Sequence, residues 1–186
     1  MIETDLPPTP PAAGAPMKRK SFRDMQCPIA RGLERVGEWW TILILRDALR
    51  GLTRFDEFQK SLEIAPNMLT RRLDSLVASG LLERRRYSER PPRDEYLLTE
   101  RGRDFRPVIQ AFFAWGNRHF APEGPSLVIV NQETGEFAEP VLVDRISGRP
   151  LSDPVFRTVP GPAASERTRR RYADQGKPAP DPEDAP

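Results

Sequence analysis

The change from helical to strand-like spacing within residues 54–99 constrains the fold of this chain more than any other feature. Between residues 66 and 80, large apolar side chains recur on one helical face, at Leu69, Leu73, Leu76 and Val77. Gly80 then ends the predicted helix. Residues 81–87 and 95–99 have the character of two strands around a loop, 88–94, that contains two prolines. The pattern therefore predicts a helix followed directly by a β-hairpin.

Arginine is concentrated on this hairpin and on the exposed side of the helix. Between Pro66 and Arg93 there are seven arginines and three acidic residues, a local charge of +4, whereas the whole chain carries +2. Asn67 and Arg71 point away from the apolar face and Thr70 lies on its flank, and such side chains suit contacts with base edges in the major groove. Arginines on the hairpin would contact phosphates. The pattern predicts a DNA-binding winged helix, with a merely solvated basic surface as the alternative.

Longer segments resemble the HxlR-type transcriptional regulators, winged helix-turn-helix proteins related to the MarR group. The resemblance covers residues 27–120 and rests on CPIARGLERVGEWWTILILRDALRG, RFDEF, NMLTRRLDSLVASGLLERR, YSERPPRDEYLLTERG and AWG. It implies a homodimer on a pseudo-palindromic double-stranded DNA operator, usually as a repressor. It places the start of the recognition helix at 66–72 and the wing at 84–93. The DNA-binding candidates are Pro66, Asn67, Met68, Thr70, Arg71, Arg72, Arg84, Arg85, Arg86, Arg90 and Arg93.

The segments before the recognition helix are expected to build the core. Pro28 suits the first turn of a helix that runs to Val36 and ends at Gly37. Residues 38–49 are apolar on most sides, which predicts a buried helix with at least one of its two tryptophans in the core. Residues 53–55 are predicted as a short strand. Residues 56–62 are predicted as the first helix of the helix-turn-helix, packed down by Phe55 and Phe58.

A strongly apolar helix is predicted after the hairpin. Thr99 is its expected N-cap, and Pro107 predicts either a kink or a late helix start, because proline lacks an N–H group. The apolar side chains on this helix exceed what the edge of a monomer needs. They predict a surface covered by a two-fold partner, with packing inside one subunit as the alternative. The dimerisation candidates are Phe105, Val108, Ile109, Phe112, Phe113 and Trp115.

Composition divides the chain into four parts, and the predicted fold class is α+β, mainly α. Residues 1–20 and 161–186 are proline-rich with few large aliphatic side chains, which predicts two disordered tails around a winged helix-turn-helix and dimerisation domain, 21–121. Residues 122–160 contain short β-like runs between glycine turns and are predicted as a small β-rich extension. Some members of the resembled family carry a zinc-ribbon-like segment there, but thiols are absent here, so no metal site is predicted.

Cys27 is the only cysteine and the candidate redox-sensing residue. The resemblance implies that a cysteine near this position senses oxidants or electrophiles. A helix N-terminus close to Arg23 and Arg31 would favour a reactive thiolate. The alternative is that Cys27 is simply a small buried apolar residue.

The sequence offers little support for an enzyme, a metalloprotein or a membrane protein. One cysteine and one histidine, His119, cannot supply a zinc site, and neither a catalytic pair nor a phosphate-binding glycine motif is found. Eighteen consecutive apolar residues occur nowhere. We therefore expect a cytoplasmic DNA-binding protein without a cofactor, with a small molecule or thiol oxidation as candidate signals. A winged-helix module that binds protein or RNA is the alternative.

Overall fold

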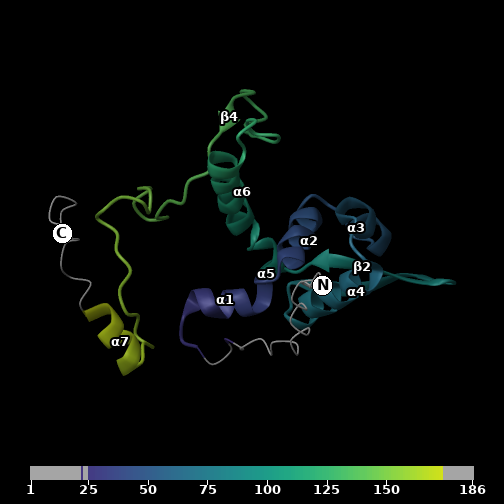
Figure 1. The fold of residues 1–186 in the computed structure, drawn as a ribbon, viewed down its shortest axis with the longest axis horizontal. Helices are drawn as coiled ribbons and strands as arrows, with labels where there is room; N and C mark the ends of the chain where they lie inside the picture. Colours follow the sequence, from purple (N-terminus) through teal and green to yellow (C-terminus); the bar gives the residue numbers. More distant parts are fainter. Residues whose placement is uncertain (1–21, 23–24, 174–186) are drawn as a thin grey trace, which may run out of the picture.

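The structure is a computed structural model that describes residue 22 and residues 25–173 (Figure 1). The predictions for residues 1–20 and for 174–186 lie outside the described residues. Four helices come first: α1 (Pro28–Val36), α2 (Trp39–Leu49), α3 (Phe55–Leu62) and α4 (Pro66–Ala78). The hairpin β1 (Leu82–Glu89) and β2 (Pro92–Leu98) is followed by α5 (Glu100–Arg103) and α6 (Arg106–Phe120). The predicted fold class, a mainly helical winged helix-turn-helix, is confirmed.

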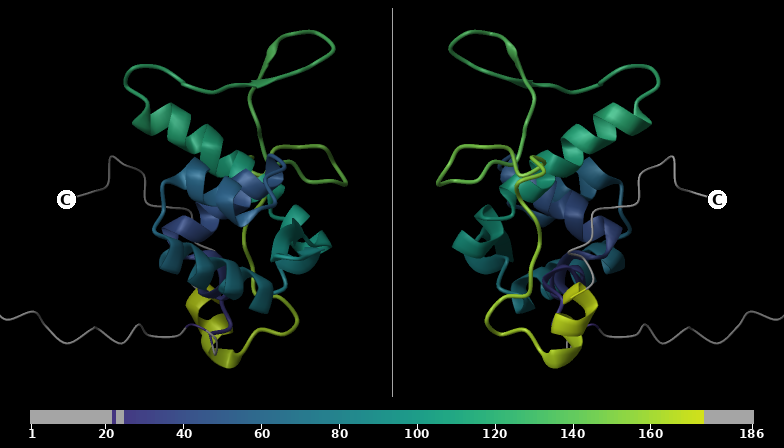
Figure 2. Two further views of the ribbon diagram at one scale, coloured as in Figure 1. Left: turned by 90° about the vertical axis from the view of Figure 1, so that its right-hand side faces the viewer. Right: turned by 90° about the vertical axis from the view of Figure 1, so that its left-hand side faces the viewer.

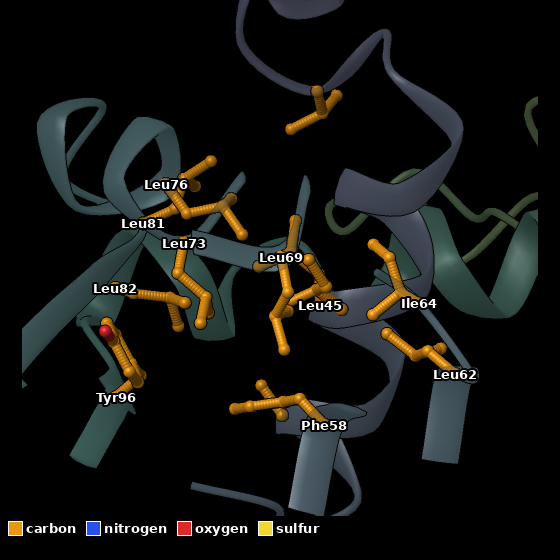
Figure 3. Close-up of a cluster of buried hydrophobic side chains, with 13 residues drawn as sticks. Leu45, Phe58, Leu62, Ile64, Leu69, Leu73, Leu76, Leu81, Leu82 and Tyr96 are labelled. Carbon is orange, nitrogen blue, oxygen red and sulfur yellow. The ribbon is translucent and has the colours of Figure 1, made fainter. Parts of the chain in front are cut away.

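A single hydrophobic cluster joins α2, α3, α4 and the base of the hairpin (Figure 3). Leu69, Leu73 and Leu76 are fully enclosed, as the helical spacing predicts. Leu69 lies beside Leu45 of α2, and Phe58 of α3 closes the cluster below them in the view of Figure 3. Burying one such side chain stabilises the fold by about 1.5–3 kcal/mol. Trp40 packs against the cluster, whereas Trp39 is 84% exposed. The prediction of one core tryptophan is therefore confirmed.

The hairpin is longer than the sequence predicts and extends away from the helices (Figure 1). Its antiparallel register runs from Leu82 opposite Leu98 to Glu89 opposite Pro92, with an irregularity between Arg86 and Ser88. The predicted loop 88–94 is therefore wrong. Pro92 stands at the first position of β2, where a missing N–H group interrupts no ladder, so the prolines mark only the tip.

A short third segment lies beside the hairpin. Arg54 forms an isolated bridge with Glu95, and the Tyr96 N–H donates to the carbonyl oxygen of Thr53 at 2.7 Å. The strand predicted at 53–55 is therefore reduced to a single bridge, because α3 begins at Phe55. This bridge ties the start of the helix-turn-helix to the base of the wing.

The junction between the wing and α6 is tightly packed. The Thr99 hydroxyl accepts a hydrogen bond from the Gly102 N–H at 3.1 Å, so Thr99 is an N-cap, but of the short helix α5 and not of the apolar helix predicted to start there. A Cβ atom at Gly102 would lie 2.2 Å from the Leu81 carbonyl oxygen, and no larger residue fits there. Helix α6 begins at Arg106 with Pro107 in its first turn, which confirms the late start.

The extension has much less sheet than its β-like runs predict. It contains two-residue strands β3 (Ile129–Val130) and β4 (Phe137–Ala138) and a bridge between Val143 and Pro150. No residue from 121 to 173 is buried, and the chain between α6 and α7 runs mostly as long loops (Figure 2). Apolar runs form wide sheets only when a second layer covers them, and the part of the chain that the structure describes provides none here.

The prediction of disorder after residue 161 is wrong for helix α7 (Glu166–Ala173). The Ser165 hydroxyl accepts from the Thr168 N–H at 3.3 Å, and Arg170 pairs with Glu166 at 3.0 Å. These are the local interactions that support a polar helix. The sequence does not predict α7 because residues 166–173 contain few aliphatic side chains and so show no apolar helical face. No helix of the described residues is long and apolar enough to cross a membrane.

Candidate nucleic-acid interface

Helix α4 presents a polar face opposite its buried leucines. Asn67, Thr70 and Arg71 are exposed near its N-terminus, and Met68 is half-buried against the core. The Thr70 hydroxyl donates to the Pro66 carbonyl at 2.9 Å, and the Asn67 side-chain oxygen accepts from the Met68 N–H at 2.8 Å. The Asn67 amide hydrogens and the Arg71 guanidinium have no partner among the described residues. This is the part of α4 that can contact base edges.

Arg72 has a different role from the one its position in the sequence implies. Its guanidinium Nη2 lies 3.1 Å from a carboxylate oxygen of Glu38, and its side chain is only 19% exposed. Glu38 stands directly before α2, so this ion pair holds α4 against α2. Arg72 therefore belongs to the packing of the helices.

Three exposed arginines of the wing, Arg84, Arg85 and Arg86, form ion pairs with acidic side chains of the same chain. Arg84 pairs with Asp74 of α4 and lies over the Tyr96 ring, 5.4 Å from its centroid. Arg85 lies 2.9 Å from Glu95, which faces it across the hairpin. These contacts fix the base and middle of the wing.

Arg86 is held in the same way. Its hydrogen bond to Asp94, at 3.2 Å across the hairpin, raises the pKa of Arg86, and the charge of Glu89 acts in the same direction. Between Pro66 and Glu95 the chain carries seven arginines and five acidic residues, a local charge of only +2. The predicted basic wing is therefore largely self-paired.

The tip of the wing is where unpaired cations remain. Arg90 and Arg93 are exposed, and neither has an acidic partner among the described residues. With Arg71, they form a set of three guanidinium groups free to meet phosphates or bases. Of the seven arginines predicted to contact DNA, four form ion pairs within the chain and three form none with the described residues.

Arg54 is a candidate that the sequence reasoning missed. It stands at the N-cap of α3, is exposed, and lies over the Tyr87 ring of the wing, 4.8 Å from its centroid. A cation between the first helix of the helix-turn-helix and the wing is well placed for a DNA backbone. The sequence could have indicated that Arg54 lies at the start of a helix, because Asp56 and Glu57 follow it in a pattern typical of a first turn. It could not indicate the contact with Tyr87, which depends on the register of the hairpin.

The apolar side chains of α6 divide into two faces. Phe105 packs against the core, and Ile109 and Phe113 turn toward α2. On the other face, three apolar side chains are about half exposed: Val108 at 52%, Phe112 at 56% and Trp115 at 50%. Packing inside one subunit therefore holds for Phe105, Ile109 and Phe113. A surface covered by a two-fold partner stays a prediction for the exposed face.

Cys27 is half-buried at the start of α1 and borders a cavity of about 280 Å³ formed with α7. Arg167 and Arg171 of α7 line the same cavity, and the Ser165 N–H donates to the Gln26 side-chain oxygen at 3.0 Å. The described residues contain no group of three or more metal-binding side chains.

The packing of α3 and α4 against the hairpin defines a winged helix-turn-helix protein, and comparisons with known proteins give the same class. The HxlR-like helix-turn-helix family model matches residues 35–124. An uncharacterised HTH-type transcriptional regulator of Mycobacterium bovis, Mb3122, is 40% identical over 135 residues, 72% of this chain and 85% of that protein. The chain belongs to the HxlR-like helix-turn-helix family of transcriptional regulators.

Two solved structures extend the similarity. PA1374 from Pseudomonas aeruginosa, whose assignment as a transcription factor is provisional, is 56% identical, with a TM-score of 0.58 over 78% of this chain and 99% of that one. PA1607, assigned in the same provisional way, is 37% identical, with a TM-score of 0.66 over 75% of this chain and 98% of the other. Both alignments reach beyond the length of the winged helix alone.

Proposed function

We propose that this chain is a homodimeric, sequence-specific DNA-binding regulator, and that it acts as a repressor. The N-terminal half of α4 enters the major groove, where Asn67, Thr70 and Arg71 read base edges. The wing tip contacts the sugar-phosphate backbone beside it. Membership of a transcriptional-regulator family supports DNA as the partner.

The observation that carries the proposal is the distribution of unpaired arginines. Arg84, Arg85 and Arg86 are held by acidic side chains, whereas Arg71, Arg90 and Arg93 are exposed and free of such partners among the described residues. An unpaired guanidinium requires no ion pair to be broken before it binds phosphate or guanine. The free arginines therefore mark the contact surface.

Binding is tested with duplexes from the DNA flanking the gene, using fluorescence anisotropy across a salt titration. Arg71→Ala should cost about 1–3 kcal/mol on the operator and reduce discrimination against unrelated duplexes. Arg90→Ala and Arg93→Ala should weaken all duplexes alike, and each should lower the salt slope by about one.

The matched control is Arg85→Ala, which removes an arginine that is already paired with Glu95. It should change the salt slope less than either tip substitution. Operator discrimination that survives Arg71→Ala would contradict the placement of α4. Equal affinity for the operator, unrelated duplex and RNA would favour a different partner for the wing.

The homodimer would form through the exposed face of α6. Val108, Phe112 and Trp115 present contiguous apolar surface, and the Phe112 and Trp115 rings lie 5.7 Å apart. Phe112→Glu should shift the protein from dimer to monomer in analytical ultracentrifugation, because it buries a charge in the contact. Phe137→Glu, at an exposed aromatic residue of the extension, is the control and should leave the dimer intact.

We also propose that oxidation of Cys27 alters operator binding. Cys27 is half-buried and borders the cavity that Arg167 and Arg171 also line, so a small oxidant can reach it from that cavity. Since the chain has one cysteine, diamide would join the Cys27 sulfurs of two copies in a disulfide and take up the two electrons and two protons. Operator affinity should change on diamide treatment of the wild type and stay constant in Cys27→Ser. Unchanged affinity in both proteins would remove this part of the proposal.

A further inference from the structure

A cavity of about 370 Å³ lies where α2, the end of α3, α6 and the start of the extension meet. Helices α2 and α6 pack against each other here (Figure 1). Leu49 of α2 and Ile109 and Phe113 of α6 form its apolar floor. The volume is within the range of small-molecule sites, about 300–1,000 Å³. This side of α6 is opposite the face proposed for dimerisation, so a second copy would leave it open.

The rim of the cavity is strongly cationic. Arg46, Arg50 and Arg106 line it, one from α2, one from the C-cap of α2 and one from the first turn of α6. Arg106 has no acidic partner among the described residues. Three guanidinium groups around one cavity repel one another, so an anion bound between them would be attracted to all three.

One buried carboxylate fixes two of these arginines. Asp47 is fully enclosed and accepts hydrogen bonds from Arg46 Nε at 2.9 Å and from the Ser61 hydroxyl at 2.7 Å, while Arg50 Nη1 lies 3.5 Å away. Asp47 can balance only one of the three positive charges, so a formal charge of about +2 remains at the rim. The sequence reasoning missed Asp47, because its helix is apolar on most sides.

We propose that this cavity binds an amphipathic organic anion, a carboxylate carried on an aromatic or short aliphatic body. Guanidinium groups hold carboxylates through paired, charge-assisted hydrogen bonds. The apolar floor covers the body of the ligand. An inorganic anion would leave that floor wet, and a neutral apolar molecule would desolvate the arginines without compensation. The combination of floor and rim therefore selects a ligand with both parts.

The cavity also connects the DNA-reading half of the protein to the dimerisation helix. Ser61 and Arg50 belong to the helix-turn-helix side, whereas Arg106 and Phe113 belong to α6, and Leu127 of the extension closes one wall. A ligand held between them changes the preferred angle of α6, provided that it binds one angle better than another. This regulatory step rests on the proposed function, but the binding step does not.

Binding is tested by isothermal titration calorimetry on the full chain, with 4-phenylbutyrate as probe and 4-phenylbutyramide and inorganic phosphate as comparators. The carboxylate should bind at least about tenfold more tightly than the amide, since a charge-assisted hydrogen bond contributes that much. Phosphate should give no heat. Equal binding of carboxylate and amide, or no binding of the carboxylate at millimolar concentration, would overturn the proposal.

Substitutions on α6 locate the site. Arg106→Gln should weaken 4-phenylbutyrate by about tenfold or more, and Arg106→Lys should recover part of the loss. Arg118→Gln removes the same charge from the same helix outside the cavity, where Arg118 pairs with Glu139, and should bind as the wild type does. Gln110→Trp, which fills the cavity, should abolish binding. Equal effects of Arg106→Gln and Arg118→Gln would show that only net charge matters and would overturn the site.

The regulatory step is measured separately, by operator anisotropy with and without saturating 4-phenylbutyrate. A severalfold change in operator affinity that Arg106→Gln removes supports it. Tight ligand binding with unchanged operator affinity overturns the regulatory step alone. If the chain binds no operator at all, the proposed function is wrong, but the calorimetry still shows whether the cavity binds 4-phenylbutyrate.

Discussion

The winged helix and the extension differ in how each treats its apolar residues. In the first, every member of the buried cluster comes from residues 36–96, and many are fully enclosed. In the second, apolar side chains such as Leu142 and Ile146 stand in solvent, the latter 93% exposed. Similar apolar content therefore gives a core in one region and none in the other. The difference is a second packing layer, which α2 supplies to the helices and which no segment within residues 25–173 supplies to the extension.

Local hydrogen bonds hold the extension instead. The Gly135 N–H donates to the Asn131 carbonyl at 2.8 Å, and the Asp144 carboxylate accepts from the Ser147 hydroxyl at 2.7 Å. Such turns fix a chain path but contribute little to global stability, because water competes for every exposed bond. We expect substitutions in the two regions to separate clearly in their effect on unfolding.

The largest difference is expected for leucine truncation. Leu73→Ala should lower the free energy of unfolding by about 2–5 kcal/mol, because it leaves a cavity in a fully packed core. Leu142→Ala removes the same atoms from the extension and should change it by no more than about 0.5 kcal/mol. Urea denaturation followed by circular dichroism measures both. Equal losses would mean that Leu142 is buried in solution.

A smaller difference is expected between two glycines. Gly102→Ala places a methyl group against the Leu81 carbonyl and should cost about 1–3 kcal/mol, the usual penalty for overpacking. Gly32→Ala, in α1 with open space around it, should stabilise the fold by about 0.5–1 kcal/mol through helix propensity. Thermal unfolding of both variants provides the measurement. An unchanged melting temperature in Gly102→Ala would show that the backbone at α5 and Leu81 can move apart to accommodate the methyl group.

The smallest expected effect is a loss of stability of the winged helix at acidic pH through Glu57. The backbone N–H of Arg54, with the largest effect, and that of Thr53 both donate to the Glu57 carboxylate. These hydrogen bonds hold the pKa of Glu57 below its ordinary value. Because the folded pKa is the lower one, this contribution is present above the unfolded pKa and is lost as the pH falls through the folded value. The side chain is exposed, so the contribution should stay below about 1 kcal/mol.

Two carboxylate variants isolate that contribution. Glu57→Gln should lower the melting temperature of the winged helix near neutral pH and leave a smaller drop on acidification. Asp144→Asn is the matched control, because the Ser147 hydroxyl likewise lowers the pKa of Asp144, but in the extension. It should not alter unfolding of the winged helix. An equal shift from both variants would indicate that the extension unfolds together with the helices.

The sequence predicts the helices well because their cause is local. The spacing of Leu69, Leu73 and Leu76 determines which side of α4 is buried, and the structure agrees. The two prolines at 91 and 92 predict a loop over residues 88–94, whereas in the structure they stand at the tip of a ladder that includes most of those residues. Periodicity reports the face of an element, and register depends on both strands together.

Site residues were harder to predict because their partners are distant in sequence. Arg72 looks like its neighbour Arg71 until Glu38 of another segment is placed beside it. Arg85 and Arg86 look like phosphate contacts until the hairpin brings Glu95 and Asp94 opposite them. Charge counting therefore overestimated the basic surface, since a count cannot show which charges cancel.

The bond between Arg84 and Asp74 joins the base of the wing to α4, and the Tyr96 ring braces it. The tip carries Arg90 and Arg93 far from this brace. The wing is thus held at its base and, through the contact between Arg54 and Tyr87, further along its length. On DNA, bending of the tip beyond Tyr87 would let Arg90 and Arg93 follow local variation in groove width while α4 keeps its position.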